Sequence, residues 1–323
     1  AEEGLPSRVV VNAFTSRGDQ ATQYGGAVYV GRSSAMTMTD SSVREAKGSG
    51  AVYVSSAKVT LSTLVVENTA CASDDDGAVM CVASNLKVNG GSNISQTKGR
   101  GLKGNGCSLV MENTRIADNA ARTNGAAMLL VSQSDLEVTR SVFASNTGEG
   151  DGGAVACEEC MSFSLQDSTF DGNVAARGGA LYLRDLPTDS IIQATRFENN
   201  TAKRGGGGAI YQIGPTFPSI DKSSVFFENS AKYGNETATD PVSALVRLGD
   251  ADGINPLKNA DGNNTTPRPV LNVSNSILVP AIRVSVLDRL GAVVKDEVTP
   301  VKVVVSSSNA SLAPLSSERL SLQ

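Results

Sequence analysis

Two consecutive stretches of the chain decide its fold: FDGNVAARGGALYL, which starts at Phe170, and FENNTAKRGGGGAIYQ, which starts at Phe197. Each has a bulky apolar residue, an Asn three positions later, a polar segment, and then Gly-Gly-Ala before alternating apolar residues. The same elements recur from about Val9 to about Asn235, with repeat glycines at intervals of 24 to 29 residues. A recurring period of this size is typical of a solenoid. The repeat glycines are Gly26, Gly50, Gly77, Gly101, Gly125, Gly153, Gly179 and Gly208.

A second series of positions aligns the repeats with one another. One bulky apolar residue occurs in each interval, at Val43, Val65, Ile94, Ile116, Phe143, Phe170, Phe197 and Phe226. A hydroxyl stands two positions before each, at Ser41, Thr63, Ser92, Thr114, Ser141, Ser168, Thr195 and Ser224. Three positions after them come Asn68, Asn119, Asn146, Asn173, Asn200 and Asn229, with Ala46 and Thr97 as exceptions. Equivalent side chains should therefore lie above one another, about 4.8 Å apart.

Each repeat holds three short runs of alternating apolar residues separated by turn residues, which favours strands over helices. One repeat cannot bury its own apolar side, so it must stack on its neighbours. The predicted fold class is all-β, a right-handed parallel β-helix of about eight coils of 24–29 residues. In its first strand the residues two and four after the repeat Gly should point inward, and a tyrosine column should occupy the outer flank. These tyrosines are Tyr29, Tyr53, Tyr182 and Tyr211.

The coil that starts at Gly101 departs from this pattern. Lys103 and Asn105 occupy positions that are apolar in the other coils. This substitution predicts a bulged strand at that point, without a functional role.

The domain boundaries follow from where the repeat ends. We assign residues 1–236 to the β-helix and residues 237–276, which are rich in Asp, Asn, Gly and Pro, to a cap and linker. Residues 277–323 contain alternating apolar strands and a turn at Asp288 to Gly291, and they resemble the start of an immunoglobulin-like β-sandwich. Because such a domain needs about twice this length, we expect the chain to be part of a longer protein.

Composition and charge argue against several functions. The net charge is −5 and there is no basic stripe, so a nucleic-acid partner is not expected. No run approaches the roughly 18 apolar residues of a membrane span. The chain has no His, which excludes imidazole catalysis, and no column gathers Asp, Lys and Arg. We therefore expect no catalytic residues, no cofactor and no metal. A polysaccharide lyase or hydrolase on a β-helix scaffold is the alternative.

The five cysteines indicate the compartment. Cys81 and Cys157 each lie 13 residues before their bulky apolar residue, Ile94 and Phe170, and so share one column. Cys107 and Cys160 lie 9 and 10 residues before theirs. A Cys81–Cys107 bridge between adjacent coils and a Cys157–Cys160 bridge within one corner are both feasible, which favours an oxidising compartment. Cys71 would then be free or paired elsewhere, and buried unpaired cysteines are the alternative.

Three polar features offer further candidate sites. The run Asp74–Asp75–Asp76 could bind Ca²⁺, although a solvated turn fits it better, and Asp151 can pair with Arg177 of the next coil. Seven Asn-x-Ser/Thr sequons could carry glycans in a eukaryotic secreted protein. They are Asn93, Asn199, Asn235, Asn263, Asn264, Asn272 and Asn309.

The combination of FxxN with GGA[ILV]Y, as quoted above, resembles the repeats of chlamydial polymorphic outer-membrane proteins and of large secreted β-helix proteins of protists and algae. The resemblance covers about two thirds of the chain. It implies an extracellular or cell-surface protein, either an adhesin or part of a wall, appendage or filament. We therefore expect a non-catalytic structural or adhesive rod whose partners are other copies, other domains of a larger surface assembly, or glycans.

Overall fold

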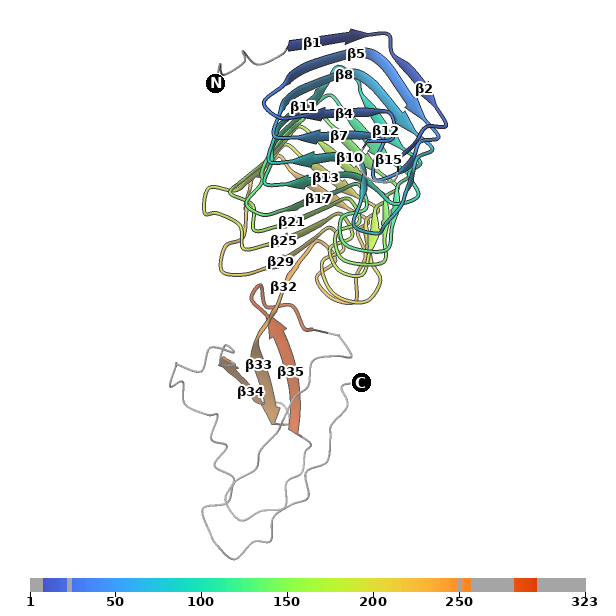
Figure 1. Ribbon diagram of the computed structural model, residues 1–323. Helices are drawn as coiled ribbons and strands as arrows, with labels where there is room; N and C mark the ends of the chain where they lie inside the picture. The colour runs from blue at the N-terminus through green and yellow to red at the C-terminus, as the bar shows by residue number, and fades with distance from the viewer. Residues whose placement is uncertain (1–7, 22–24, 249–250, 257–281, 295–323) are drawn as a thin grey trace, which may run out of the picture. The chain divides into compact units, whose positions relative to one another are not determined.

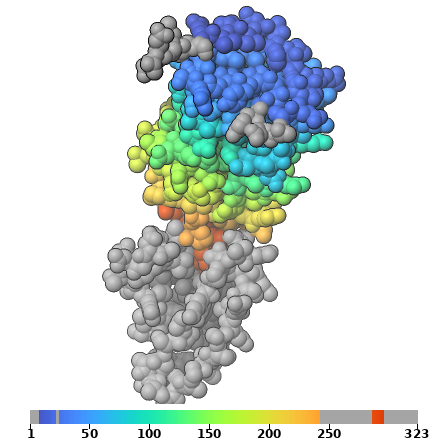
Figure 2. Space-filling model, in the orientation of Figure 1, coloured from blue at the N-terminus to red at the C-terminus, as the bar shows by residue number. Residues whose placement is uncertain are grey.

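The computed structural model describes residues 8–21, 25–248, 251–256 and 282–294. The chain divides into two units, Ala1–Asp240 and Pro241–Gln323. The first unit is a right-handed parallel β-solenoid of about eight turns, which confirms the predicted fold class (Figure 1). Figure 2 shows the coils of this unit as successive colour bands, because the coils follow one another along the solenoid in sequence order. The described residues contain no α-helix, so no helix among them could cross a membrane.

One sheet of the solenoid, called here the nine-stranded sheet, follows the Gly-Gly-Ala segments. Its strands pair in parallel from coil to coil. They are β4 (Val28–Gly31), β7 (Val52–Ser55), β10 (Gly77–Val82), β13 (Arg100–Asn105), β17 (Met128–Val131), β21 (Val155–Glu158), β25 (Leu181–Arg184), β29 (Ile210–Ile213) and β32 (Thr237–Thr239).

A 16-stranded sheet forms the other two broad faces, which are continuous because β5 (Ala35–Arg44) and β8 (Lys58–Glu67) bend across both. The first face also contains β1 (Arg8–Asn12), β11 (Asn85–Asn89), β14 (Ser108–Glu112), β18 (Asp135–Thr139), β22 (Ser162–Gln166), β26 (Ile191–Gln193) and β30 (Ser219–Ile220). The second contains β2 (Thr15–Arg17), β12 (Asn93–Ser95), β15 (Arg115–Ala117), β19 (Val142–Ala144), β23 (Thr169–Asp171), β27 (Arg196–Glu198) and β31 (Val225–Phe227).

Two-residue strands close each coil. They form two narrow sheets that bridges at Lys98 connect. One holds β3 (Gln20–Ala21), β6 (Lys47–Gly48) and β9 (Ala70–Cys71), and the other holds β16 (Ala120–Ala121), β20 (Thr147–Gly148), β24 (Val174–Ala175) and β28 (Thr201–Ala202).

The predicted Phe column is a continuous stack inside the second face. Phe143, Phe170, Phe197 and Phe226 are register partners in successive strands. Their ring centroids are 4.7, 5.0 and 5.0 Å apart, close to the spacing of the strands that carry them. The first three are fully buried, so the aromatic rings form the core of the C-terminal coils.

The predicted Asn column is a buried hydrogen-bonded ladder at the next corner. From Asn119 to Asn200, each Nδ2 donates to Oδ1 of the next Asn at 2.9 to 3.0 Å, and each backbone N–H donates to the same oxygen. Each Nδ2 also donates to the backbone carbonyl of the bulky residue one coil earlier, such as Phe143 for Asn173. A side chain with two donors and one accepting oxygen thus satisfies both neighbouring coils. The ladder comprises Asn119, Asn146, Asn173, Asn200 and Asn229.

In the coil that starts at Gly50, the alignment predicted from the sequence is wrong by one residue. Val66, not Val65, pairs with Val43 and Ile94, and Leu64 and Thr69 take the positions assigned to Thr63 and Asn68. Thr63 adopts the left-handed backbone conformation (φ 51°) at the bend and is exposed, so the inward series restarts at Leu64. Two adjacent valines had made both alignments possible.

The predicted bulge after Gly101 is wrong. Strands β10, β13 and β17 pair without a register shift, with Leu102 and Gly104 pointing inward. Gly101 occupies the column of the alanines that follow the repeat glycines, and Arg100 takes the glycine position. Likewise Ala126, not Gly125, aligns with Gly153, since Met128 pairs with Val155.

The Gly-Gly pair is required by contacts rather than by chain flexibility alone. Gly178 has a φ of 59°, and a Cβ there would lie 2.1 Å from the carbonyl oxygen of Leu181. A Cβ on Gly179 would lie 2.2 Å from the carbonyl oxygen of Gly208 in the next coil. The first glycine therefore permits the turn, and the second permits two coils to stack at this corner.

The solenoid ends slightly later than residue 236. Strand β32 (Thr237–Thr239) pairs with β29, and the unit boundary falls after Asp240. In the second unit, β33 (Pro241–Leu248) pairs antiparallel with β34 (Ala251–Pro256) and β35 (Ile282–Asp288), so a strand begins within the segment predicted as linker. A turn joins Asp288 to Gly291. An immunoglobulin-like domain needs a second sheet, which the described residues do not contain, so it remains a prediction.

Candidate functional site

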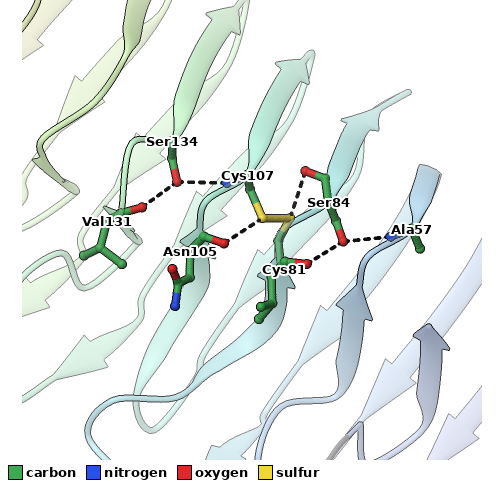
Figure 3. The surroundings of a disulfide bond; sticks show 8 residues. Ala57, Cys81, Ser84, Asn105, Cys107, Val131 and Ser134 are labelled. Atoms are coloured by element: carbon green, nitrogen blue, oxygen red, sulfur yellow. Dashed lines mark hydrogen bonds between the residues drawn. A yellow bond between two sulfur atoms is a disulfide. The ribbon is translucent and has the colours of Figure 1, made fainter. Parts of the chain in front are cut away.

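The Cys81–Cys107 disulfide replaces one link in a column of corner hydroxyls. Figure 3 shows the arrangement, in which the backbone N–H of Ala57 donates to Ser84 Oγ at 3.0 Å and that of Cys107 donates to Ser134 Oγ at 3.1 Å. Cys107 stands where the neighbouring coils carry serine, and its sulfur bonds to Cys81 of the preceding coil, with the Cα atoms 6.3 Å apart. The bond joins two coils covalently.

The second disulfide, Cys157–Cys160, lies within one corner, with the Cα atoms 6.0 Å apart. Both of its cysteines are buried, and because they are bonded to each other neither presents a free thiol. The remaining cysteine, Cys71, is free and pairs in register with Gly48 in the narrow sheet. Burial, and secondarily the charge of Asp76, raises the pKa of the Cys71 thiol to about 12. A thiol with this pKa carries little thiolate at neutral pH, so Cys71 is not suited to act as a nucleophile.

Arg100 is the most unusual buried residue. Its side chain is fully buried, and it donates to the backbone carbonyls of Asn124, Gly125, Asp75 and Asp76 and to Thr123 Oγ1. Burial lowers its pKa, and nearby Asp75 opposes this. The guanidinium therefore binds together two loops on either side of its own coil.

The three aspartates predicted as a turn lie on one of those loops. Asp75 pairs with Lys103 Nζ at 2.6 Å and Asp74 lies 4.0 Å from Arg122. Among the described residues, no group of three potential ligands could hold a metal ion. These ion pairs are typical of a solvent-exposed turn whose side chains contact residues of neighbouring coils.

Asp151 and Arg177 pair as their positions suggest. The guanidinium donates to both carboxylate oxygens, from Nε at 3.1 Å and from Nη2 at 2.6 Å, and lies over the rings of Tyr182 and Tyr211 at 5.7 and 4.9 Å. Burial alone would lower the pKa of Arg177, but the bonds to Asp151 raise it. Tyr211 also donates to Asp240 at 2.9 Å. This cluster binds the last coils of the solenoid together.

The tyrosine column predicted for the outer flank exists, in two separate pairs. Tyr29 and Tyr53 have ring centroids 5.8 Å apart, and Tyr182 and Tyr211 have theirs 6.3 Å apart. Tyr29 is 55% exposed and Tyr53 is half-buried, whereas Tyr182 and Tyr211 are buried.

At the ends of strands β4, β7 and β10 lies a shallow depression of about 460 Å³, at the corner between the nine-stranded and 16-stranded sheets. It spans three coils and its lining is made of small, hydroxyl and amide side chains with one lysine. The lining residues are Ser33, Ser34, Ala35, Ser56, Ala57, Lys58, Ala83, Ser84 and Asn85. The depression was not predicted from the sequence, although the serine pairs Ser33–Ser34 and Ser55–Ser56 near the ends of two tyrosine-bearing strands were a signal for it.

Three of the seven sequons fall within the described residues. Asn199 and Asn235 are exposed, whereas Asn93 is half-buried, with its Nδ2 bonded to Ser95 Oγ at 2.9 Å. Asn263, Asn264, Asn272 and Asn309 lie outside the described residues. Glycosylation therefore remains a prediction at all seven.

Fold, repeats and corner chemistry together define a right-handed parallel β-helix repeat protein. A family model described as "right handed beta helix region" matches residues 25–185, and the Chlamydia polymorphic membrane protein repeat matches residues 194–212. The repeats are thus similar to those of chlamydial polymorphic membrane proteins. No solved structure matches the chain.

A particular relative is the probable autotransporter YfaL of Escherichia coli strain K12. It is 34% identical over 117 residues, which cover 34% of this chain. The matched segment is 9% of the length of YfaL, so this chain spans only a small part of that relative.

Proposed function

We propose that the protein is a surface-exposed, non-catalytic β-helix that serves as a stiff structural or adhesive element outside the cell. The observation that carries this proposal is the uninterrupted solenoid, in which Phe and Asn columns bind every C-terminal coil to the next. Such an array resists local opening because each coil is stabilised by both neighbours. The similarity to an autotransporter and to polymorphic membrane proteins supports an extracellular place.

The two disulfides support an oxidising compartment independently of these relatives. Cys81–Cys107 and Cys157–Cys160 lie at buried corners where they stabilise the fold and do no visible chemistry. Partners would then be other copies, other domains of a larger surface assembly, or glycans.

Location is tested on intact cells that carry the protein, with an antibody against residues 100–240. We expect labelling without permeabilisation and loss of the label after brief treatment of the cells with protease. A cytoplasmic protein of the same cells is the control and should resist the protease. Labelling that needs permeabilisation would contradict the proposal.

The alternative of an enzyme is tested with the purified full chain and polygalacturonate. A lyase would release unsaturated uronates, which absorb in the ultraviolet, and a hydrolase would release reducing ends. We expect neither product above the level of a heat-denatured sample. Steady release of either product by the native protein, and not by the denatured sample, would contradict the non-catalytic role and indicate an enzyme.

A further inference from the structure

Three Asn-Gly pairs lie where strands of the solenoid begin or end. They are Asn89–Gly90, Asn105–Gly106 and Asn124–Gly125. An asparagine before glycine can react with its own backbone, because glycine has no side chain that obstructs attack of its amide nitrogen on the asparagine Cγ. In a folded chain the reaction is slowed by hydrogen bonds that hold this nitrogen and the side-chain amide in place. The three pairs differ in these hydrogen bonds.

Two of the pairs are held by their neighbours. The backbone N–H of Gly125 donates to the carbonyl oxygen of Asp151 at 2.9 Å. The side-chain amide of Asn124 is hydrogen-bonded through both of its atoms, with Oδ1 accepting from the N–H of Asp151 at 2.8 Å. The N–H of Gly106 donates to the carbonyl oxygen of Val131 at 3.2 Å. In both pairs the attacking nitrogen is therefore part of a bond between coils.

The pair Asn89–Gly90 lacks these restraints. Within the part of the chain that the structure describes, the N–H of Gly90 has no acceptor and the side chain of Asn89 makes no hydrogen bond. Asn89 Oδ1 is buried without a partner, so no hydrogen bond is broken when the side chain turns toward Gly90. Gly90 itself is exposed, so hydroxide can reach its N–H.

An additional residue at this corner explains why the N–H of Gly90 is unpaired. Between the paired positions Val88 and Asn93 lie the four residues 89–92, whereas the three residues 112–114 fill the same bend in the next coil. The N–H that donates to the next coil here is that of Gly91, at 2.8 Å. The bond between coils thus bypasses Gly90.

The peptide group between Asn89 and Gly90 is also polarised. Ser92 Oγ donates to the carbonyl oxygen of Asn89 at 2.6 Å, and the N–H of Ser92 donates to the same oxygen at 3.3 Å. When the N–H of Gly90 loses its proton, the negative charge is shared with this oxygen, and both hydrogen bonds stabilise it. The nucleophilic form of the nitrogen therefore forms more readily.

We propose that Asn89 is a site of self-modification, at which the side-chain amide is converted to a carboxylate. Hydroxide removes the proton from the Gly90 nitrogen, which attacks Asn89 Cγ, and the bond from Cγ to the amide nitrogen breaks as ammonia leaves. One water then opens the resulting succinimide ring at either carbonyl, which gives an aspartyl or an isoaspartyl residue. The net reaction consumes one water and releases one ammonia, without a cofactor.

The modification goes beyond the proposed surface role and does not depend on it. Each modified chain gains one negative charge, and the isoaspartyl form adds one carbon atom to the backbone. This corner has little room for that atom, because a Cβ on Gly90 would already lie 2.5 Å from Ser62 Oγ in the preceding coil. In a protein that persists for long, the modified fraction should increase with age.

The test compares the three pairs within one molecule. The purified full chain is incubated in its native state, then reduced, alkylated and digested with trypsin. Cleavage after Lys and Arg places the pairs in separate peptides, which are residues 88–98, 104–115 and 123–140. Mass spectrometry follows the conversion of amide to acid, and fragmentation assigns it to a position. We expect Asn89 to convert at least tenfold faster than Asn105 and Asn124, and faster at pH 8 than at pH 6.

The same chain unfolded in concentrated urea provides the reference rate for each pair, because no fold protects any of them there. Asn89→Gln is the matched variant, since its longer side chain would have to form a larger ring, and its peptide should stay unmodified. Equal native rates for the three pairs, relative to their rates in urea, would overturn the inference. So would conversion at Asn93 instead of Asn89, or a native peptide 88–98 that stays unmodified while the unfolded chain reacts. These comparisons use the wild-type chain and hold even if the variant does not fold.

Discussion

The N-terminal and C-terminal coils share one backbone arrangement but stabilise it differently. In the first coils the inner column at the second face is Val43, Val66, Ile94 and Ile116, followed by the Phe stack. At the neighbouring corner the Asn ladder replaces Ala46 and the hydroxyl pair Thr69 and Thr97, whose oxygens are 3.0 Å apart. Backbone register in this fold therefore does not depend on one type of column. The type of column should instead decide how much each coil contributes to stability.

The largest effect is expected in the Phe stack. Phe170→Ala should lower the free energy of unfolding by about 3–5 kcal/mol, because it removes a fully buried ring that stacks on two others. Val66→Ala in the N-terminal column should cost less, since it removes fewer atoms. Urea denaturation of both variants measures the difference. Equal costs would contradict this prediction, because burial alone should make the loss of the larger Phe side chain more costly.

The Asn ladder should come next. Asn173→Ala removes a side chain that bonds to Phe143, Asn146 and Asn200, and it leaves buried backbone groups without partners. We expect a loss of about 3 kcal/mol, at about 1–3 kcal/mol for each unsatisfied group after partial relaxation. Asn105→Ala, the same change at an exposed strand position with ordinary backbone geometry, is the matched control and should cost under about 0.5 kcal/mol. A ladder variant as stable as this control would contradict the interpretation.

A smaller, pH-dependent effect is expected at Asp221 in the last coil. Hydrogen bonds from Ser223 and Ser224, and one from the backbone N–H of Ala194, lower the pKa of this carboxyl to about 2. A carboxyl with a lowered pKa stabilises the fold above its ordinary pKa near 4, and this stabilisation is lost as pH falls toward 2.

The Asp221 effect is isolated with Asp221→Asn. Urea midpoints of wild type and variant should differ at pH 6 and converge near pH 2. A difference that stays constant with pH would show that the carboxylate charge is not involved.

The smallest effect is expected at Cys71. Because its thiol has a pKa of about 12, little thiolate exists at neutral pH, and a maleimide reagent should label it only after unfolding. Cys71→Ala should change the free energy of unfolding by less than about 0.5 kcal/mol, since Ala and Gly fill the same column elsewhere. Mass spectrometry of labelled native protein measures this, and rapid native labelling would contradict it.

The sequence predicted the C-terminal coils better than the N-terminal ones for a physical reason. Phe and Asn are large or specific enough that one alignment alone satisfies them, so the fold and both columns could be predicted. Val65 and Val66 are interchangeable in pattern, and only the bend at Thr63 decides which of them points inward. Arg100 was missed because a glycine at position 101 imitated the repeat glycine. The depression depends on how three corners pack together, which no single repeat encodes.

The Cys81–Cys107 bond has a consequence for a protein under load. Pulling on the two ends of a β-helix would peel coils off one at a time and lengthen the chain by about 3.3–3.6 Å per residue released. The bond spans a separation of 26 residues, so about 90 Å of extension would be withheld until it is reduced. The Cys157–Cys160 bond, with a separation of 3, withholds almost none. Reducing conditions would thus lengthen the fully extended tether through the first bond alone.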